Sequence, residues 1–397
     1  MTAPLSLPRA AARTAHATGE NWESVLDEVL QNLELDSCDL VFISLGGRFL
    51  NHAHDIAQEL WARLGAPVLF GSSSSTVIVD DREDETGNQI ALLALNLPGG
   101  IISTARITNL TLENTPSPAA FRKRLNVLPD EINTWIVLSN PLRFDTGQLL
   151  ALLETAYPDK LVLGGMTSPS QSTRQSMLVL NEEAFADGAI LLGIGGAFTM
   201  HTFVSHGSDP VGDPWTITGV SGEWIESIGN RPALDVVEEI LRNTPGDLRP
   251  IVQSNLLVGF AIDEYRSEFF RSDFIVRSMT GIDQASRSIA TGFLPVLGQT
   301  IQFQLRDAAT ADLDLTLCLD GARLELTGRR PLAALMFSND LRGELLFGSA
   351  HHDAALVRKK FPPVPLLGAT TSAEIGPATG RTILNTGSVA LGLLLPA

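Results

Sequence analysis

Three short stretches of the chain combine glycine with small hydroxyl residues directly after an apolar, strand-like run. Glycine lets the backbone approach a ligand closely, and serine and threonine supply uncharged donors and acceptors. Ligands of α/β proteins bind beyond the carboxyl ends of parallel strands, so these stretches are the first candidates for a binding site. A plain turn is the alternative for each stretch taken singly. The residues concerned are Gly71, Ser72 and Ser73, then Gly164, Gly165, Thr167 and Ser168, and finally Thr370 and Thr371.

Charged and amide side chains accompany the third stretch. Ser338 and Asn339 precede Arg342, and Glu374 follows the hydroxyl residues. An arginine can hold a carboxylate with two parallel N–H donors, and a glutamate can accept from an ammonium group. These side chains predict a site for an amino-acid-like ligand. A structural ion pair between Arg342 and Glu374 is the alternative.

Motifs for catalysis are missing from the sequence. It has no Walker A lysine, no G-x-S-x-G turn and no H-E-x-x-H helix. Two histidine pairs at the starts of predicted helices are open to two interpretations, a metal site or ordinary helix N-termini. We expect no catalytic residue, no bound metal and no cofactor. The pairs are His52 and His54 with Asp55, and His351 and His352 with Asp353.

An internal repeat organises the elements that must position these residues. Each copy reads as a strand, a helix, a second strand that ends in the glycine and hydroxyl stretch, and a final apolar strand. A helix that crosses over between two buried strands makes them parallel. The predicted fold is therefore mixed α+β of the α/β type, with repeated β-α-β-β units that form mixed sheets in two lobes. The first strands are 40–44, 135–139 and 334–338, and the final strands are 90–95, 189–192 and 389–394.

An acidic run lies between the second and final strands of the first copy. It reads Asp80-Asp81-Arg82-Glu83-Asp84-Glu85. A solvated hairpin loop is the main interpretation, and a docking face for a basic partner is the alternative.

Composition limits the partners and the compartment. The chain has 397 residues, with 28 basic against 45 acidic side chains and a formal net charge of −17. This balance argues against nucleic acid and against anionic membrane surfaces as partners. No apolar run reaches the length of a membrane span, and two cysteines cannot form a disulfide framework. We expect a cytoplasmic protein.

Several short motifs, in order along the chain, resemble the FIST family. The string from Gly328 to Gly348 resembles its C-terminal signature, as does Ala373-Glu374-Ile375-Gly376-Pro377. The runs 40–44, 67–75 and 206–212 resemble its N-terminal domain. The family often carries a Cys-x-x-Arg-Gly run where this chain has Ser338-Asn339-Asp340-Leu341-Arg342-Gly343, and the missing cysteine puts in doubt any role that needs a thiolate.

The resemblance implies a stand-alone sensory protein that binds a small ligand and signals to a partner protein in trans. It implies a FIST N-terminal domain over 20–235 and a FIST C-terminal domain over 236–397. Residues 1–19, with Arg9 and Arg13 and no acidic residue, are expected to be a terminal extension, and a targeting segment is the alternative. The alternatives are a protein–protein scaffold without a ligand, and a hydrolase or transferase that uses serine or threonine of the repeated loops.

Overall fold

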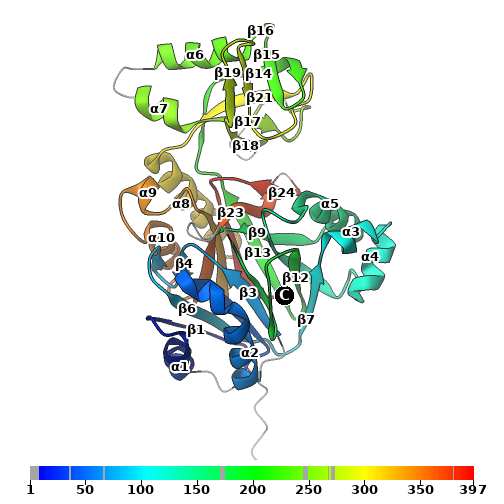
Figure 1. Cartoon of the computed structure of the whole chain (residues 1–397), viewed down its shortest axis with the longest axis vertical. Helices are drawn as coiled ribbons and strands as arrows, with labels where there is room; N and C mark the ends of the chain where they lie inside the picture. Colours follow the sequence, from blue (N-terminus) through cyan, green and yellow to red (C-terminus); the bar gives the residue numbers. More distant parts are fainter. Residues whose placement is uncertain are drawn as a thin grey trace, which may run out of the picture.

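Three copies of one unit build the larger of two lobes in this computed structural model (Figure 1). The structure describes residues 9–34, 37–65, 68–169, 175–244, 249–266, 268–269, 273–378 and 380–397. In each unit the first two strands are parallel, and the final strand runs antiparallel to the first. The predicted mixed α+β fold is confirmed. The units comprise β2 (Leu40–Gly46), α2 (Ala53–Leu64), β3 (Val68–Ser73) and β6 (Gln89–Asn96); β8 (Ile132–Ser139), α5 (Thr146–Ala156), β9 (Leu161–Thr167) and β12 (Ala189–Gly196); and β22 (Ala333–Asn339), α10 (His352–Lys360), β23 (Leu366–Ala378) and β25 (Val389–Pro396).

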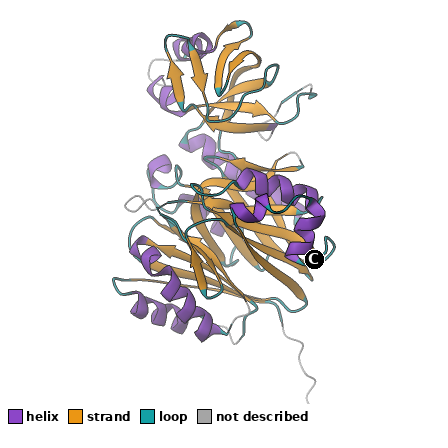
Figure 2. Cartoon of the chain, turned by 45° about the vertical axis from the view of Figure 1, so that its right-hand side comes forward, coloured by secondary structure: helices purple, strands orange, loops and turns teal. Residues whose placement is uncertain are grey.

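Burial explains why these segments take this form. Strands β2 and β22 are buried along their whole length, as expected for strands that are covered on both faces. The crossover helices present an apolar stripe to the sheets and lie on the outside of the lobe (Figure 2). In α2 the stripe is Ile56, Ala57 and Leu60, all fully buried.

Each unit gains one more strand, which runs antiparallel to its final strand. These added strands are β1 (Ala11–Thr18), β7 (Gly100–Ile107) and β13 (Phe198–Ser205). The terminal extension expected over 1–19 is therefore wrong for Ala11–Thr18, because β1 pairs with β6 over eight residues and buries Ala12, Ala15 and Ala17. Residues 1–8 of that extension lie outside the described residues.

The three units exchange short strands in a closed cycle. The hairpin of β4 (Val77–Val79) and β5 (Arg82–Asp84), which leaves the first unit, pairs with β23 of the third. The later part of β23, extended by β24 (Arg381–Asn385), pairs with β9 of the second unit. The hairpin of β10 (Leu178–Leu180) and β11 (Glu183–Phe185), which leaves the second unit, pairs with β3 of the first. The chain thus passes from each unit to a neighbour at the carboxyl end of the second strand.

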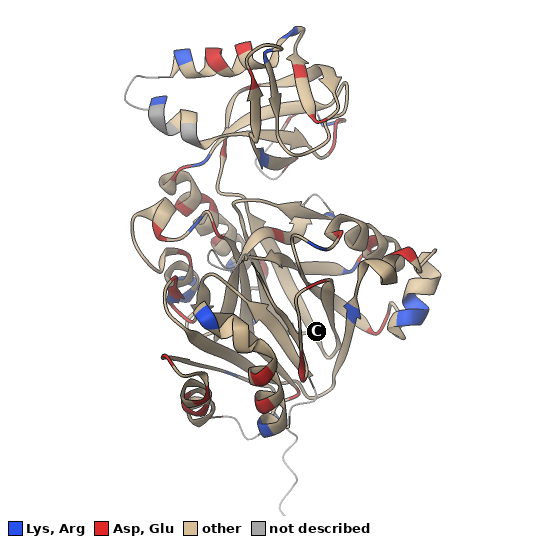
Figure 3. Ribbon diagram, viewed as in Figure 1, with Lys and Arg blue, Asp and Glu red and all other residues tan. Residues whose placement is uncertain are grey.

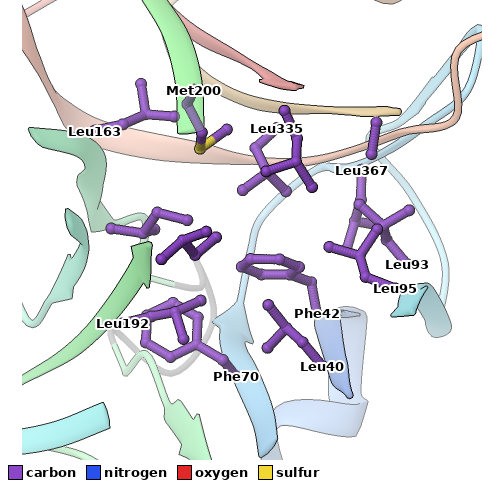
Figure 4. Close-up of a cluster of buried hydrophobic side chains, with 14 of the residues drawn as sticks. Leu40, Phe42, Phe70, Leu93, Leu95, Leu163, Leu192, Met200, Leu335 and Leu367 are labelled. Carbon is purple, nitrogen blue, oxygen red and sulfur yellow. The ribbon is translucent and has the colours of Figure 1, made fainter. Parts of the chain in front are cut away.

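One hydrophobic core joins the three units. Phe42 and Phe70 of the first unit meet edge to face, with ring centroids 5.9 Å apart. Figure 4 shows them facing Leu192 of the second unit and Leu335 of the third. Because side chains from all three units fill one cluster, the units form a single body.

The smaller lobe is a separate antiparallel layer with its own core. The domain boundary expected between 235 and 236 lies inside this lobe, so the lobes divide the chain differently from the two predicted segments. Arg277 donates to Leu384 O at 2.9 Å and thereby links the lobes. The lobe contains β14 (Asp209–Ser221), β15 (Trp224–Ile228), β16 (Arg231–Pro232), α6 (Ala233–Asn243), α7 (Arg249–Asn255), β17 (Leu256–Ala261), β18 (Phe274–Ser278), β19 (Gly281–Asp283), β20 (Ser288–Ala290) and β21 (Thr300–Leu305).

The remaining helices lie on the larger lobe (Figure 1). They are α1 (Trp22–Asn32), a 3-10 helix η1 (Gly47–His52), α3 (Asn109–Glu113), α4 (Pro118–Leu125), α8 (Ala308–Glu325) and α9 (Glu344–Phe347). Within the described ranges, no helix has both the length and the apolar character needed to span a membrane.

Candidate functional site

A cavity of about 390 Å³ lies where the three units meet. Side chains that follow the second strand of each unit contribute to its wall, because the exchange of hairpins brings these strand ends together. The first unit supplies two hydroxyl residues and two carboxylates, the second unit a serine, and the third unit most of the rest. The lining residues are Ser75, Thr76, Glu83, Glu85, Ser168, Pro169, Ser338, Asp340, Leu341, Arg342, Gly343, Leu345 and Thr370.

One hydroxyl from each unit meets at this cavity. Ser75 Oγ lies 2.8 Å from Thr370 Oγ1 and donates to Ser168 Oγ at 3.2 Å. Ser168 Oγ in turn donates to a carboxylate oxygen of Asp340 at 2.8 Å. The backbone N–H of Thr76 also donates to Thr370 Oγ1, at 3.0 Å. A continuous hydrogen-bonded row therefore connects all three units on the cavity wall.

Arg342 is engaged within its own unit. Its Nε and Nη2 donate to the two carboxylate oxygens of Asp353 at 2.6 and 3.0 Å, and both side chains are fully buried. Its Nη1 lies against Gly207, where an added Cβ would be 2.7 Å away. Burial raises the pKa of Asp353, but the Arg342 guanidinium and His352 outweigh burial and hold that pKa below its usual range. Arg342 thus pairs with Asp353 and not with Glu374, and its fork is occupied before any ligand arrives.

Glu374 lies outside the wall of the cavity, in a buried hydrogen-bond network. It accepts from Asn339 Nδ2 at 2.9 Å, from Thr371 Oγ1 at 2.8 Å, and from Ser388 Oγ and N–H at 2.6 and 3.1 Å. Burial raises the pKa of Glu374 to about 7, against the opposing effect of these hydrogen bonds. These contacts give Asn339, Thr371 and Glu374 a structural role. They hold the carboxylate of Glu374 outside the cavity, where it cannot accept from the ammonium group of a ligand.

Glu83 is the ionisable side chain that the sequence interpretation misplaced. The acidic run does form a hairpin, as predicted, but Glu83 is only 5% exposed. Its carboxylate accepts from the N–H of Ala354 at 2.6 Å, in the first turn of α10, where the helix dipole favours a negative charge. Burial and the nearby charge of Asp353 raise the pKa of Glu83 to about 7. The hairpin of the first unit is thereby attached to the helix of the third.

Carboxylates dominate the electrostatics of the cavity. Glu83, Glu85 and Asp340 line it, and the one guanidinium in the wall is neutralised by Asp353. Burial raises the pKa of Asp340, against the hydrogen bond from Ser168. Such a wall favours a ligand that brings hydrogen-bond donors or a positive charge.

The structure brings four of the predicted site residues to the cavity, namely Ser168, Ser338, Arg342 and Thr370. Gly71 and Ser72 line a separate, mostly apolar cavity of about 30 Å³ between the sheets. Ser73 Oγ accepts from Met177 N–H at 2.8 Å, and Thr167 Oγ1 donates to Ser176 Oγ at 2.7 Å. Both hydroxyls therefore bind a neighbouring segment of the chain and do not line the cavity.

The predicted glycines have a packing role. In each unit the first glycine of the stretch lies opposite the first strand so closely that an added Cβ would collide with a carbonyl oxygen. The added Cβ would lie 1.9 Å from Ile43 O at Gly71, 1.9 Å from Val137 O at Gly164 and 2.4 Å from Met336 O at Gly368. A Cβ on Gly165 would lie 2.4 Å from Thr371 Cγ2. Close strand pairing therefore accounts for Gly71, Gly164 and Gly165.

The histidine pairs occupy helix starts, which is one of the two interpretations considered above. His352 begins α10, and His52 ends the 3-10 helix before α2. In the part of the chain that the structure describes, no group of three or more His, Cys, Asp or Glu side chains is arranged to hold a metal ion.

The sequence matches two family models over most of its length. The FIST N domain model matches residues 39–231, and the FIST C domain model matches residues 233–377. The uncharacterized protein Mb0898c of Mycobacterium bovis is 33% identical over 353 residues, which cover 88% of this chain and 89% of that protein. The uncharacterized protein Rv0628c of Mycobacterium tuberculosis is 33% identical over 258 residues, which cover 64% of this chain and 67% of that protein.

A solved structure of a cyanuric acid hydrolase aligns with 98% of this chain and 100% of its own length. The sequence identity is 8% and the TM-score is 0.38. A similarity of this degree carries no argument about the chemistry of this chain.

Proposed function

The chain belongs to the FIST family, and on this premise we propose that it is a sensory protein that binds a small polar ligand in the cavity between its three units and signals to a partner protein. The observation that carries the proposal is the row of Ser75, Ser168 and Thr370 on the cavity wall. A ligand that hydrogen-bonds to this row contacts all three units at once. Its binding therefore favours the conformation of the cavity wall that fits it best, and a sensor needs such a difference between states.

The charges of the cavity narrow the chemistry of the ligand. The carboxylates of Glu83, Glu85 and Asp340 can accept from an amine. The Nε and Nη2 of Arg342 are held by Asp353, and its Nη1, which has no hydrogen-bond partner among the described residues, is buried against Gly207. We therefore propose a ligand with an amino group, such as an amino acid or a related small amine, held by that amino group and not by a carboxylate.

A thermal-shift series tests the proposal. The probes are small amines, amino acids and their N-acetylated forms, each added to the full chain. Binding raises the melting temperature by mass action, and we expect the rise with free amines and its loss on acetylation. A series in which no amine raises the melting temperature contradicts the proposal.

A variant links the binding to the hydroxyl row. Ser75→Ala should weaken binding of an amine identified in that series by about fivefold or more in calorimetry, because a neutral hydrogen bond contributes about 1 kcal/mol. Ser221→Ala, at an exposed serine in the smaller lobe, is the matched control and should bind as the unchanged chain does. Equal affinity of the two variants would place the site elsewhere, and turnover of a bound compound would replace the sensory role by an enzymatic one.

A further inference from the structure

A second hollow on the larger lobe has the opposite charge to the cavity between the units. It is a groove of about 760 Å³ between β1, the end of α8 and the segments 328–332 and 360–365. Five basic side chains line it and no acidic one does, although acidic residues outnumber basic ones in the chain and are spread over both lobes (Figure 3). The basic side chains are Arg13, Arg323, Arg329, Arg330 and Lys360.

Most of this positive charge is available to a partner. Asp320 lies next to the groove and binds Lys360 at 2.7 Å, with Arg323 4.0 Å away, so one carboxylate offsets part of the charge. Arg13, Arg329 and Arg330 form no ion pair with any residue that the structure describes, and all three are exposed. An acidic ligand is therefore the natural complement of this groove.

One wall of the groove is the edge of a sheet. Strand β1 is the end strand of the six-stranded sheet and pairs on one side with β6. Its residues Ala11–Arg13, together with Ala10 just before the strand, line the groove. An edge strand carries backbone donors and acceptors that an extended chain can pair with, which is a common way to bind a peptide. The other wall contains Pro331, Pro362, Pro363 and Pro365, which add a rigid surface without backbone donors.

We propose that this groove binds an extended acidic segment of a partner protein, which adds a strand to β1 and places its carboxylates against Arg13, Arg329 and Arg330. A long polyanion such as nucleic acid would be repelled by the acidic remainder of the surface, whereas a short segment meets only the groove. The inference takes from the proposed function only that the output passes to a partner protein. Its test uses no small-molecule ligand, so the two can fail separately.

Fluorescence anisotropy with the full chain tests the proposal. The probe is a labelled peptide of alternating glutamate and valine, with an alternating lysine and valine peptide for comparison. We expect the acidic peptide alone to bind. Arg329→Glu together with Arg330→Glu should weaken that binding by about tenfold or more, since two attractive charges become repulsive. Lys123→Glu together with Arg124→Glu, a second exposed adjacent pair on α4, is the matched control with the same change in net charge and should leave binding unaltered.

Two further measurements separate strand addition from simple attraction of anions. N-methylation of every peptide nitrogen keeps every carboxylate and removes the backbone donors from both edges of the extended peptide, so it should abolish binding. If the double variant misfolds, Arg330→Glu alone takes its place. This single change keeps the contact of Arg329 with the carbonyl of Pro396 and should still weaken binding of the peptide. Full binding by the methylated peptide, displacement by equimolar inorganic pyrophosphate, or equal loss in the α4 control would each overturn the proposal.

Discussion

The hydroxyl oxygen of Ser75 lies 2.8 Å from that of Thr370, although 295 residues separate the two along the chain. The exchange of short strands between units explains this proximity. Hairpin β4–β5 leaves the first unit and pairs with β23 of the third, which brings the residues before the hairpin against the strand that carries Thr370. The position of the candidate site is thus a direct consequence of how the three units are joined.

Thr370→Val should destabilise the fold. Thr370 Oγ1 accepts from the N–H of Thr76 at 3.0 Å in a buried position, so valine leaves that donor without an acceptor. We expect the free energy of unfolding to fall by about 1–3 kcal/mol. Urea unfolding measures this loss. Thr155→Val, at an exposed position on α5, should change the free energy of unfolding by less than about 0.5 kcal/mol. If Thr370→Val changed the free energy of unfolding no more than this control does, the hydroxyl row would contribute nothing to stability.

Gly164→Ala should lower the free energy of unfolding by more than a typical substitution does. Residue 164 has φ near +148°, and a Cβ there would lie 1.9 Å from Val137 O, so the parallel pair of β8 and β9 would have to separate. We expect a loss of about 3 kcal/mol or more. Gly321→Ala in α8 meets open space and should instead stabilise by up to about 1 kcal/mol. The two melting temperatures should therefore move in opposite directions, and a tolerated Gly164→Ala would contradict the packing role of this glycine.

Removal of one partner of the buried ion pair between Arg342 and Asp353 should strongly lower the free energy of unfolding. Asp353→Ala leaves the guanidinium of Arg342 buried and unpaired, and we expect a loss of about 3–5 kcal/mol. Asp187→Ala removes a partner of Arg106 at the same distance of 2.6 Å, but on the surface, and should cost less than about 1 kcal/mol. Chemical denaturation of the two variants compares them directly. Similar losses would mean that burial of the first pair has no energetic consequence.

Stability should increase as the pH falls from 8 to 6.5. The pKa values of Glu83 and Glu374 are raised to about 7 by folding, from 4.5, so in this window the folded state holds protons that the unfolded state has released. Protonation therefore stabilises the fold, by about 1 kcal/mol for each group over this interval. Below pH 6.5 the trend should weaken, because burial lowers the pKa of His206 to about 4 and the unfolded state then binds the extra proton.

Glu374→Gln checks the source of this dependence. The neutral amide removes one titrating group, so the slope of stability against pH between 8 and 6.5 should fall to about half. Glu226→Gln, at an exposed glutamate of β15, should keep the original slope. An unaltered slope in the Glu374→Gln chain would assign the dependence to other groups.

The sequence by itself determined the local elements of this protein. Short apolar runs, amphipathic helices and glycines at matching positions depend on neighbouring residues, so the three units and the antiparallel final strands could be predicted from the chain. The same pattern identified Ser168, Ser338, Arg342 and Thr370 as residues near a common site.

Only the tertiary structure decided which strand ends meet and what surrounds each charge. Ser75 was missed in favour of Ser72 and Ser73, because the chain crosses to the third unit only after Ser73 ends β3. Glu83 reads as solvated in the sequence and becomes buried because a hairpin of one unit lies against a helix of another. Pairing between distant strands depends on contacts that no local pattern contains, and so does the choice of Asp353 as the partner of Arg342. The physical reason is that burial and ion pairing are properties of the assembled units, whereas strand and helix periodicity is already present in each segment alone.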